Sequence, residues 1–146
     1  DFLQKYFKKE LFFTDVEGKT KDEVLKNLCR KVEQEKGLPE TFTASVLKRE
    51  ELTPTDYGNL VALPHPERAF QERAFVAVAG LKEPIFWFRQ KVQVVFLTAI
   101  GREEDENLQQ FYEATTDLIL RPADVQNLIR HPDYDRLIQL LRRAEE

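Results

Sequence analysis

The sequence predicts an α/β domain of three layers, with helices packed on both faces of a central sheet. Helical periodicity alternates along the chain with apolar runs of strand length, which is typical of this class. Among these runs, Val94–Leu97 is continuously apolar, and this predicts a central strand that is covered on both faces. A length of 146 residues is that of one ordinary domain, so we expect a single domain over residues 1–146.

The first quarter of the chain predicts one strand followed by one long helix. A helical turn within Phe2–Lys9 leads to a short buried strand at Leu11–Phe13. Thr20 and Glu23 have the spacing of a capping box, and Gly37 is placed to end the helix that follows. The apolar face of this helix consists of Val24, Leu25, Leu28, Cys29 and Val32.

A second helix and four strands are expected in the middle of the chain. The helix covers about Glu40–Glu51 and directs Phe42, Val46 and Leu47 inward. Apolar and β-branched runs bounded by turn residues predict the strands, which are Leu60–Leu63, Ala74–Gly80, Ile85–Phe88 and Val92–Ala99.

The last third of the chain predicts three helices. The acidic cluster Glu103–Glu106 suits a helix N-terminus because the helix dipole is positive there. The helix that follows carries residues at helical spacing: Leu108, Phe111, Tyr112, Thr115, Leu118 and Ile119. Pro122 and Pro132 punctuate two further helices, and the inner face of the last one consists of Tyr134, Leu137, Ile138 and Leu141.

The composition argues against several classes of protein. A content of 42% hydrophobic and 33% charged residues is that of a soluble globular chain, and we identify neither a signal peptide nor a membrane helix. The net charge of −4 argues against direct nucleic-acid binding by this domain. The single cysteine excludes an internal disulfide and fits a reducing cytoplasm. The chain lacks an initiator Met, which indicates a piece of a longer protein.

The most informative segment ends in His65, one of two histidines in the chain. Gly58 permits a tight turn, Leu60–Leu63 gives a rigid support, and Pro64 restricts the backbone beside the histidine. Neutral imidazole is a good nucleophile near pH 7, and the phosphoimidazole that it forms can pass its phosphoryl group on. His65 is therefore the candidate catalytic residue, against the plainer interpretation of a loop histidine that shapes a turn between two prolines.

The segment Arg49–His65 resembles the phosphorylation motif of the fructose/mannitol-type (type 2) enzyme IIA domain of the bacterial sugar phosphotransferase system. The shared features are an acidic residue, a spacer, Gly58, and then aliphatic-Ala-aliphatic-Pro-His. The resemblance reaches from about Leu11 to Leu141 and implies a mixed central sheet and a histidine that receives a phosphoryl group.

The same resemblance assigns a second catalytic residue, Arg49. Within Lys48–Glu51, a solvated helix charge is the ordinary interpretation of this arginine. In the enzyme IIA family, however, an arginine at the head of the motif lies beside the active histidine, and Arg49 occupies that place. A guanidinium group suits the role, because it offers paired donors to phosphoryl oxygens and stays charged.

The other candidate residues have structural interpretations. His131 is expected to cap or precede the last helix, and Cys29 and Trp87 are expected to pack in the core. No His or Cys accompanies Glu103–Glu106 at metal-ligand spacing, so we expect neither a metal site nor a cofactor. A Pro-His-Pro sequence also occurs in metal-dependent phosphoesterases, but those enzymes need several more histidines than this chain contains.

Three segments resemble one subgroup, the C-terminal IIA-like domain of transcriptional regulators and antiterminators of the BglG/LicR/MtlR kind. They are Lys5–Phe12, Ala62–Pro66 and Pro84–Leu97. The resemblance implies a regulatory phosphoacceptor domain whose partners are the histidine-containing phosphocarrier protein and the phosphotransferase-system regulation domains of its parent protein.

The alternative is a transport component that relays the phosphoryl group to a sugar-specific enzyme IIB. Two departures from the family pattern count against efficient relay. Pro66 stands where sugar carriers commonly have Gly or another small residue. Asn107 and Leu108 stand where the mannitol branch has a second histidine.

Overall fold

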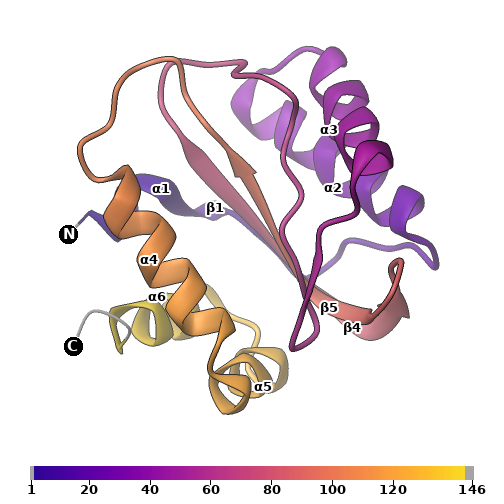
Figure 1. Ribbon diagram of the computed structural model, residues 1–146, viewed down its shortest axis with the longest axis vertical. Helices are drawn as coiled ribbons and strands as arrows, with labels where there is room; N and C mark the ends of the chain where they lie inside the picture. Colours follow the sequence, from indigo (N-terminus) through magenta and orange to yellow (C-terminus); the bar gives the residue numbers. More distant parts are fainter. Residues whose placement is uncertain (1, 144–146) are drawn as a thin grey trace.

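The computed structural model describes residues 2–143, which form a five-stranded mixed sheet between two layers of helices (Figure 1). The strand order is β1-β4-β5-β3-β2; β1 runs parallel to β4, β4 antiparallel to β5, and β5 parallel to β3. The elements are α1 (Leu3–Tyr6), β1 (Phe7–Phe13), α2 (Lys21–Lys36), α3 (Thr41–Leu52), β2 (Asp56–Gly58), β3 (Val61–Ala62), β4 (Phe75–Phe86), β5 (Lys91–Ala99), α4 (Leu108–Ile119), α5 (Pro122–Arg130) and α6 (Tyr134–Arg143).

Two separate apolar clusters lie on the two faces of the sheet. Helices α2 and α3 cover one face, and α4, α5 and α6 together with α1 cover the other. Alternate residues of β5 belong to different clusters, Val95 and Leu97 to the first and Val94 and Phe96 to the second, and all four are buried. The predicted three-layer architecture and the central, doubly covered strand are therefore confirmed.

Local sequence signals fix the ends of α2 as predicted. The Thr20 hydroxyl oxygen accepts a hydrogen bond from the backbone N–H of Glu23 at 3.2 Å. Gly37 adopts the left-handed conformation, with φ of 65°, at the other end of the helix. An L-residue with a side chain rarely adopts this conformation, which explains why the helix ends at a glycine.

The N-terminal strand is longer than the sequence predicted. The helical turn covers only Leu3–Tyr6, and β1 already begins at Phe7 instead of Leu11. Phe7 is buried and pairs with Val76 of β4, so contacts with a distant strand extend β1 into residues that were expected to be helical.

Three further predictions were wrong in extent. The short strand at Ile85–Phe88 is the end of β4, which continues past an irregular register between Gly80 and Ile85. β3 has two residues rather than four, and β2 was not predicted. In addition, the acidic cluster Glu103–Glu106 lies in the loop before α4 rather than in its first turn, and Tyr112 is 37% exposed.

Candidate functional site

His65 lies in the loop that follows β3, at the edge of the sheet where the parallel strands β3 and β5 end. Two backbone hydrogen bonds hold the residues before it. The N–H of Leu63 donates to the carbonyl oxygen of Thr55 at 3.0 Å, and the N–H of Thr98 in β5 donates to that of Pro64, also at 3.0 Å. Pro64 and Pro66 are buried while His65 between them is half-buried, so the loop presents the imidazole on a fixed backbone.

The two nitrogens of the His65 ring have different surroundings. Nδ1 lies 3.3 Å from the carbonyl oxygen of Leu63. Because a carbonyl oxygen only accepts hydrogen bonds, this contact requires a proton on Nδ1. In the neutral ring, Nε2 then carries the free electron pair, and it is the nitrogen available for nucleophilic attack.

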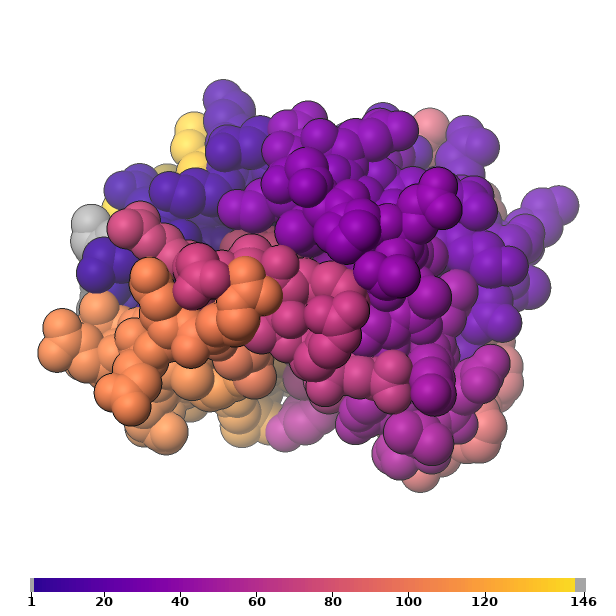
Figure 2. Space-filling model, turned by 90° about the horizontal axis from the view of Figure 1, so that it is seen from above, coloured from indigo at the N-terminus to yellow at the C-terminus, as the bar shows by residue number. Residues whose placement is uncertain are grey.

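Helix α3 is attached to the loop of His65. The hydroxyl oxygen of Ser45 accepts a hydrogen bond of 2.7 Å from the backbone N–H of Glu67, two residues after the histidine. Arg49 lies one helical turn after Ser45 and therefore on the same side of α3. Figure 2 shows this end of the molecule, with the chain segment that contains His65 between α3 and the loop that leads to α4.

The guanidinium of Arg49 binds the end of its own helix in this structure. Nη1 donates to the carbonyl oxygen of Thr53 at 2.9 Å, and the side chain is half-buried. Among residues 2–143, no direct hydrogen bond joins Arg49 to His65. The structure thus places the two predicted residues on segments that a hydrogen bond joins, but within the described residues the two side chains are not hydrogen-bonded to each other.

Glu50 is the acidic residue at the head of the signature that ends in His65, and its carboxylate is buried, which the sequence did not predict. Its side chain is 1% exposed and accepts three hydrogen bonds: from Thr55 N at 2.6 Å, from Thr55 Oγ1 at 2.8 Å and from Trp87 Nε1 at 2.9 Å. Trp87 is a core residue, as predicted, and it also donates from its indole N–H. The charged stretch Lys48–Glu51 gave no sign that one of its members is buried.

Asp56 is a second buried carboxylate, and it holds β2 against the β4–β5 hairpin. Its Oδ2 accepts hydrogen bonds from the backbone N–H groups of Arg89 at 2.7 Å and of Gln90 at 2.9 Å. Burial by itself would raise the pKa of Asp56, but these hydrogen bonds to the charged form outweigh it, and the pKa lies below its ordinary value.

Two loops cross beside the site. The backbone N–H groups of Arg102 and Glu103 donate to the carbonyl oxygens of Gln71 at 3.0 Å and Glu72 at 2.9 Å. Further along the second loop, Asp105 accepts a hydrogen bond of 2.6 Å from the Tyr6 hydroxyl. Burial, and then this bond, raise the pKa of Tyr6, so the hydroxyl stays a donor. Asp105 of the acidic cluster therefore anchors the loop, and the first turn of α4, all of whose residues the structure describes, holds no acidic side chain to interact with the helix dipole.

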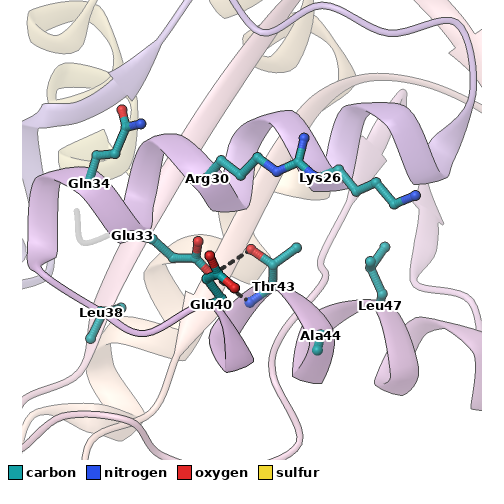
Figure 3. Close-up of a pocket in the computed structure, with 9 residues that line it drawn as sticks. All are labelled: Lys26, Arg30, Glu33, Gln34, Leu38, Glu40, Thr43, Ala44 and Leu47. Carbon is teal, nitrogen blue, oxygen red and sulfur yellow. Dashed lines mark hydrogen bonds between the residues drawn. The ribbon is translucent and has the colours of Figure 1, made fainter.

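A groove between α2 and α3 is distinct from this site (Figure 3). It has a volume of about 620 Å³, and neither His65 nor Arg49 lines it. The Glu33 carboxylate in the groove accepts hydrogen bonds from Thr43 N at 2.9 Å and Thr43 Oγ1 at 2.6 Å, which join the two helices. Glu33 therefore ties α2 to α3.

The remaining candidates occupy structural positions. His131 is exposed and lies between α5 and α6, as predicted, and Cys29 is buried in the core, where burial raises the pKa of its thiol. Within residues 2–143, no three His, Cys, Asp or Glu side chains are grouped so as to hold a metal ion. The same residues include no helix that is long and apolar enough to cross a membrane.

Comparisons with known proteins agree with the resemblance noted in the sequence. Residues 5–144 match the family described as phosphoenolpyruvate-dependent sugar phosphotransferase system, EIIA 2. The probable licABCH operon regulator of Bacillus subtilis (strain 168) is 37% identical over 91% of this chain, and the transcriptional regulator ManR of the same strain is 27% identical over 82%. The aligned parts make up only 21% and 18% of these two proteins, about a fifth of their length.

A solved structure shows the same fold. In the complex of enzyme IIA(Mtl) and phosphorylated enzyme IIB(Mtl) from Escherichia coli, the similar chain has a TM-score of 0.75 and 18% identity. The alignment covers 92% of this chain and 97% of that one.

Proposed function

Since the chain belongs to the EIIA 2 family of the phosphoenolpyruvate-dependent sugar phosphotransferase system, we propose that it is a phosphoryl-accepting regulatory domain that is phosphorylated on His65. The observation that carries the proposal is the Leu63 carbonyl oxygen 3.3 Å from His65 Nδ1, which leaves Nε2 free as the nucleophile. A histidine on a rigid backbone at a sheet edge is also accessible to a partner protein.

The proposed reaction is one phosphoryl transfer between two imidazoles. Nε2 of His65 attacks the phosphorus of a phosphohistidine on the histidine-containing phosphocarrier protein; a new N–P bond forms and the donor's N–P bond breaks. The donor ring leaves with the electron pair and takes up a proton. The Arg49 guanidinium, one turn from the helix residue that binds the His65 loop, would leave Thr53 and bind the equatorial oxygens of the transferring group.

The regulatory role is supported by the two Bacillus subtilis relatives, a probable operon regulator and a transcriptional regulator, of which the aligned parts make up only about a fifth. We propose that the domain belongs to such a regulator and contacts its phosphotransferase-system regulation domains in the cytoplasm. Phosphorylation adds nearly two negative charges to the surface and would alter those contacts. Nucleic-acid binding would then reside in other parts of the protein.

The alternative function is that of a transport component that passes the phosphoryl group to an enzyme IIB. It is favoured by the fold shared with enzyme IIA(Mtl), which that structure shows in complex with phosphorylated enzyme IIB(Mtl). The departures at Pro66 and Asn107 weigh against it.

Intact-mass measurement after incubation with phosphoenolpyruvate, enzyme I and the phosphocarrier protein tests the proposal. We expect one added phosphoryl group that is labile in acid and stable in base. His65→Ala should abolish it, whereas His131→Ala, the matched control at the exposed second histidine, should leave it unchanged. Labelling that persists in His65→Ala and disappears in His131→Ala would refute the assignment.

A further inference from the structure

The backbone that fixes the His65 ring is connected to a buried acid that the phosphotransfer chemistry does not itself use. Glu50 is 1% exposed, and both of its carboxylate oxygens are occupied by donors of Thr55 and Trp87. A polar group that is removed from water at this depth needs hydrogen-bond partners, and three are present.

From Glu50 a continuous series of hydrogen bonds leads to the imidazole. Glu50 binds the N–H and the hydroxyl of Thr55 at 2.6 and 2.8 Å. The carbonyl oxygen of Thr55 accepts the N–H of Leu63 at 3.0 Å, and the carbonyl oxygen of Leu63 faces His65 Nδ1 at 3.3 Å. Two short covalent links, one within Thr55 and one within Leu63, connect these hydrogen bonds, so little freedom is left between the acid and the ring.

We propose that Glu50 is a positioning residue for the phosphoryl-accepting histidine: through Thr55 and Leu63 it holds the carbonyl oxygen that keeps the proton on Nδ1 and leaves Nε2 free. The role deepens the proposed function and rests on it. Glu50 follows Arg49 in the chain, so the end of α3 supplies both the guanidinium and the buried carboxyl group of the site.

The series also explains why Thr55 is held so firmly in a segment of little regular structure. Thr55 lies between α3 and the three-residue strand β2 and makes hydrogen bonds through its N–H, its hydroxyl and its carbonyl oxygen. Without the carboxylate, the Thr55 N–H and hydroxyl would lose their partner, and the Thr55 carbonyl would no longer have a fixed place for Leu63.

The tautomer of His65 is the most direct readout, and it is measured without any phosphoryl donor. Nitrogen-15 NMR of the imidazole at a pH where the ring is neutral distinguishes a proton on Nδ1 from one on Nε2. We expect the Nδ1–H form in the wild-type chain. In Glu50→Gln, and to a smaller extent in Thr55→Val, we expect a large population of the Nε2–H form, together with phosphorylation of His65 that is slower by roughly tenfold to a hundredfold.

Two variants separate positioning from general loss of stability. Trp87→Phe removes one donor of Glu50 but keeps the series toward His65, so the tautomer should stay on Nδ1. Asp124→Asn alters another buried carboxylate, in the opposite helical layer, where it pairs with Arg121 and Arg143. Asp124→Asn should lower the midpoint of thermal unfolding and leave the proton of His65 on Nδ1.

The outcomes are distinguishable. If both Glu50→Gln and Thr55→Val keep the wild-type tautomer and the wild-type rate of His65 phosphorylation, the positioning role is refuted. The proposed function is not affected by that outcome. A tautomer that moves as far in Asp124→Asn as in Glu50→Gln would overturn the positioning role as well. A shifted tautomer in Glu50→Gln, together with no phosphorylation of the wild-type chain, would refute the proposed function. The positioning of the His65 ring by Glu50 would still stand.

Discussion

The guanidinium of Arg49 donates a hydrogen bond of 2.9 Å to one backbone carbonyl oxygen, that of Thr53 at the end of α3. If it stabilises the transferring phosphoryl group, Arg49→Ala should slow phosphorylation of His65 by roughly 10²–10⁴-fold, because removing one positioned charge typically costs about 3–5 kcal/mol of transition-state stabilisation. Arg49→Lys should recover only part of the rate, since an ammonium group restores the charge but not the planar fork.

Thermal unfolding of both Arg49 variants supplies the control. Losing one hydrogen bond of a half-exposed side chain should change the free energy of unfolding by less than about 1 kcal/mol. A normal rate in Arg49→Ala would reduce the residue to a solvated helix charge. A slow rate accompanied by a large fall in the midpoint would make it a structural residue instead.

Asp56 should give the fold a dependence on pH in the acid range. Its pKa in the folded chain lies below the value of about 3.9 for an unfolded aspartate. The charged form therefore stabilises the fold at neutral pH, and this contribution is lost as the pH falls below about 4 toward the folded pKa. We expect Asp56→Asn to cost about 1–3 kcal/mol at pH 7, because two backbone N–H groups lose a charged acceptor.

Urea denaturation of Asp56→Asn and of the wild type between pH 7 and pH 3 measures this. The difference in the free energy of unfolding should shrink as the pH falls. A difference that stays constant over this range would show that the aspartate charge contributes nothing to the fold.

Among the loops, the crossing beside the site depends on a glycine. A side chain on Gly101 would meet the carbonyl oxygen of Glu72 and lie 2.6 Å from the carbonyl carbon of Arg73, both of them backbone atoms that cannot turn away. We expect Gly101→Ala to lower the free energy of unfolding by about 1–3 kcal/mol, because the two loops must separate.

Gly37→Ala is the comparison for that variant, measured by the same chemical denaturation. Gly37 has φ of 65° and open space around it, so alanine there meets only backbone strain of about 1–2 kcal/mol. If Gly101→Ala unfolds no more easily than the wild type and leaves the loop amide signals in place, the close approach contributes nothing to stability.

The elements that the sequence predicted well are those whose signals are local. α2 begins at a threonine cap and ends at a glycine, and both are visible in the chain. β2 could not be predicted in this way, because Asp56 finds its partners at Arg89 and Gln90, more than thirty residues later. Glu50 is similar: its burial depends on Trp87, and only the fold brings the two together.

For the whole molecule, the regulatory interpretation predicts poor delivery of the phosphoryl group to other proteins. Pro66 has no N–H to offer a phosphoryl oxygen next to His65, and the region before α4 holds Asn107 in place of a second histidine. We expect the phosphorylated chain to keep its label on mixing with an enzyme IIB. Radiolabel transfer followed over time measures this, with a transport-type enzyme IIA as the positive control. Rapid loss of label to the IIB would favour the transport role.

The position of β5 has a consequence for hydrogen exchange. β5 pairs along its length with β4, meets β3 at Val94 and Val95, and is covered by an apolar cluster on each side. Its amides should therefore exchange only when the whole fold opens, and those of Asp56–Gly58 at the sheet edge much sooner. The amide of Thr98, which binds Pro64 next to the histidine, belongs to this slow group. The two-residue strand β3, which precedes the His65 loop, is therefore held in place by the strand whose amides exchange last.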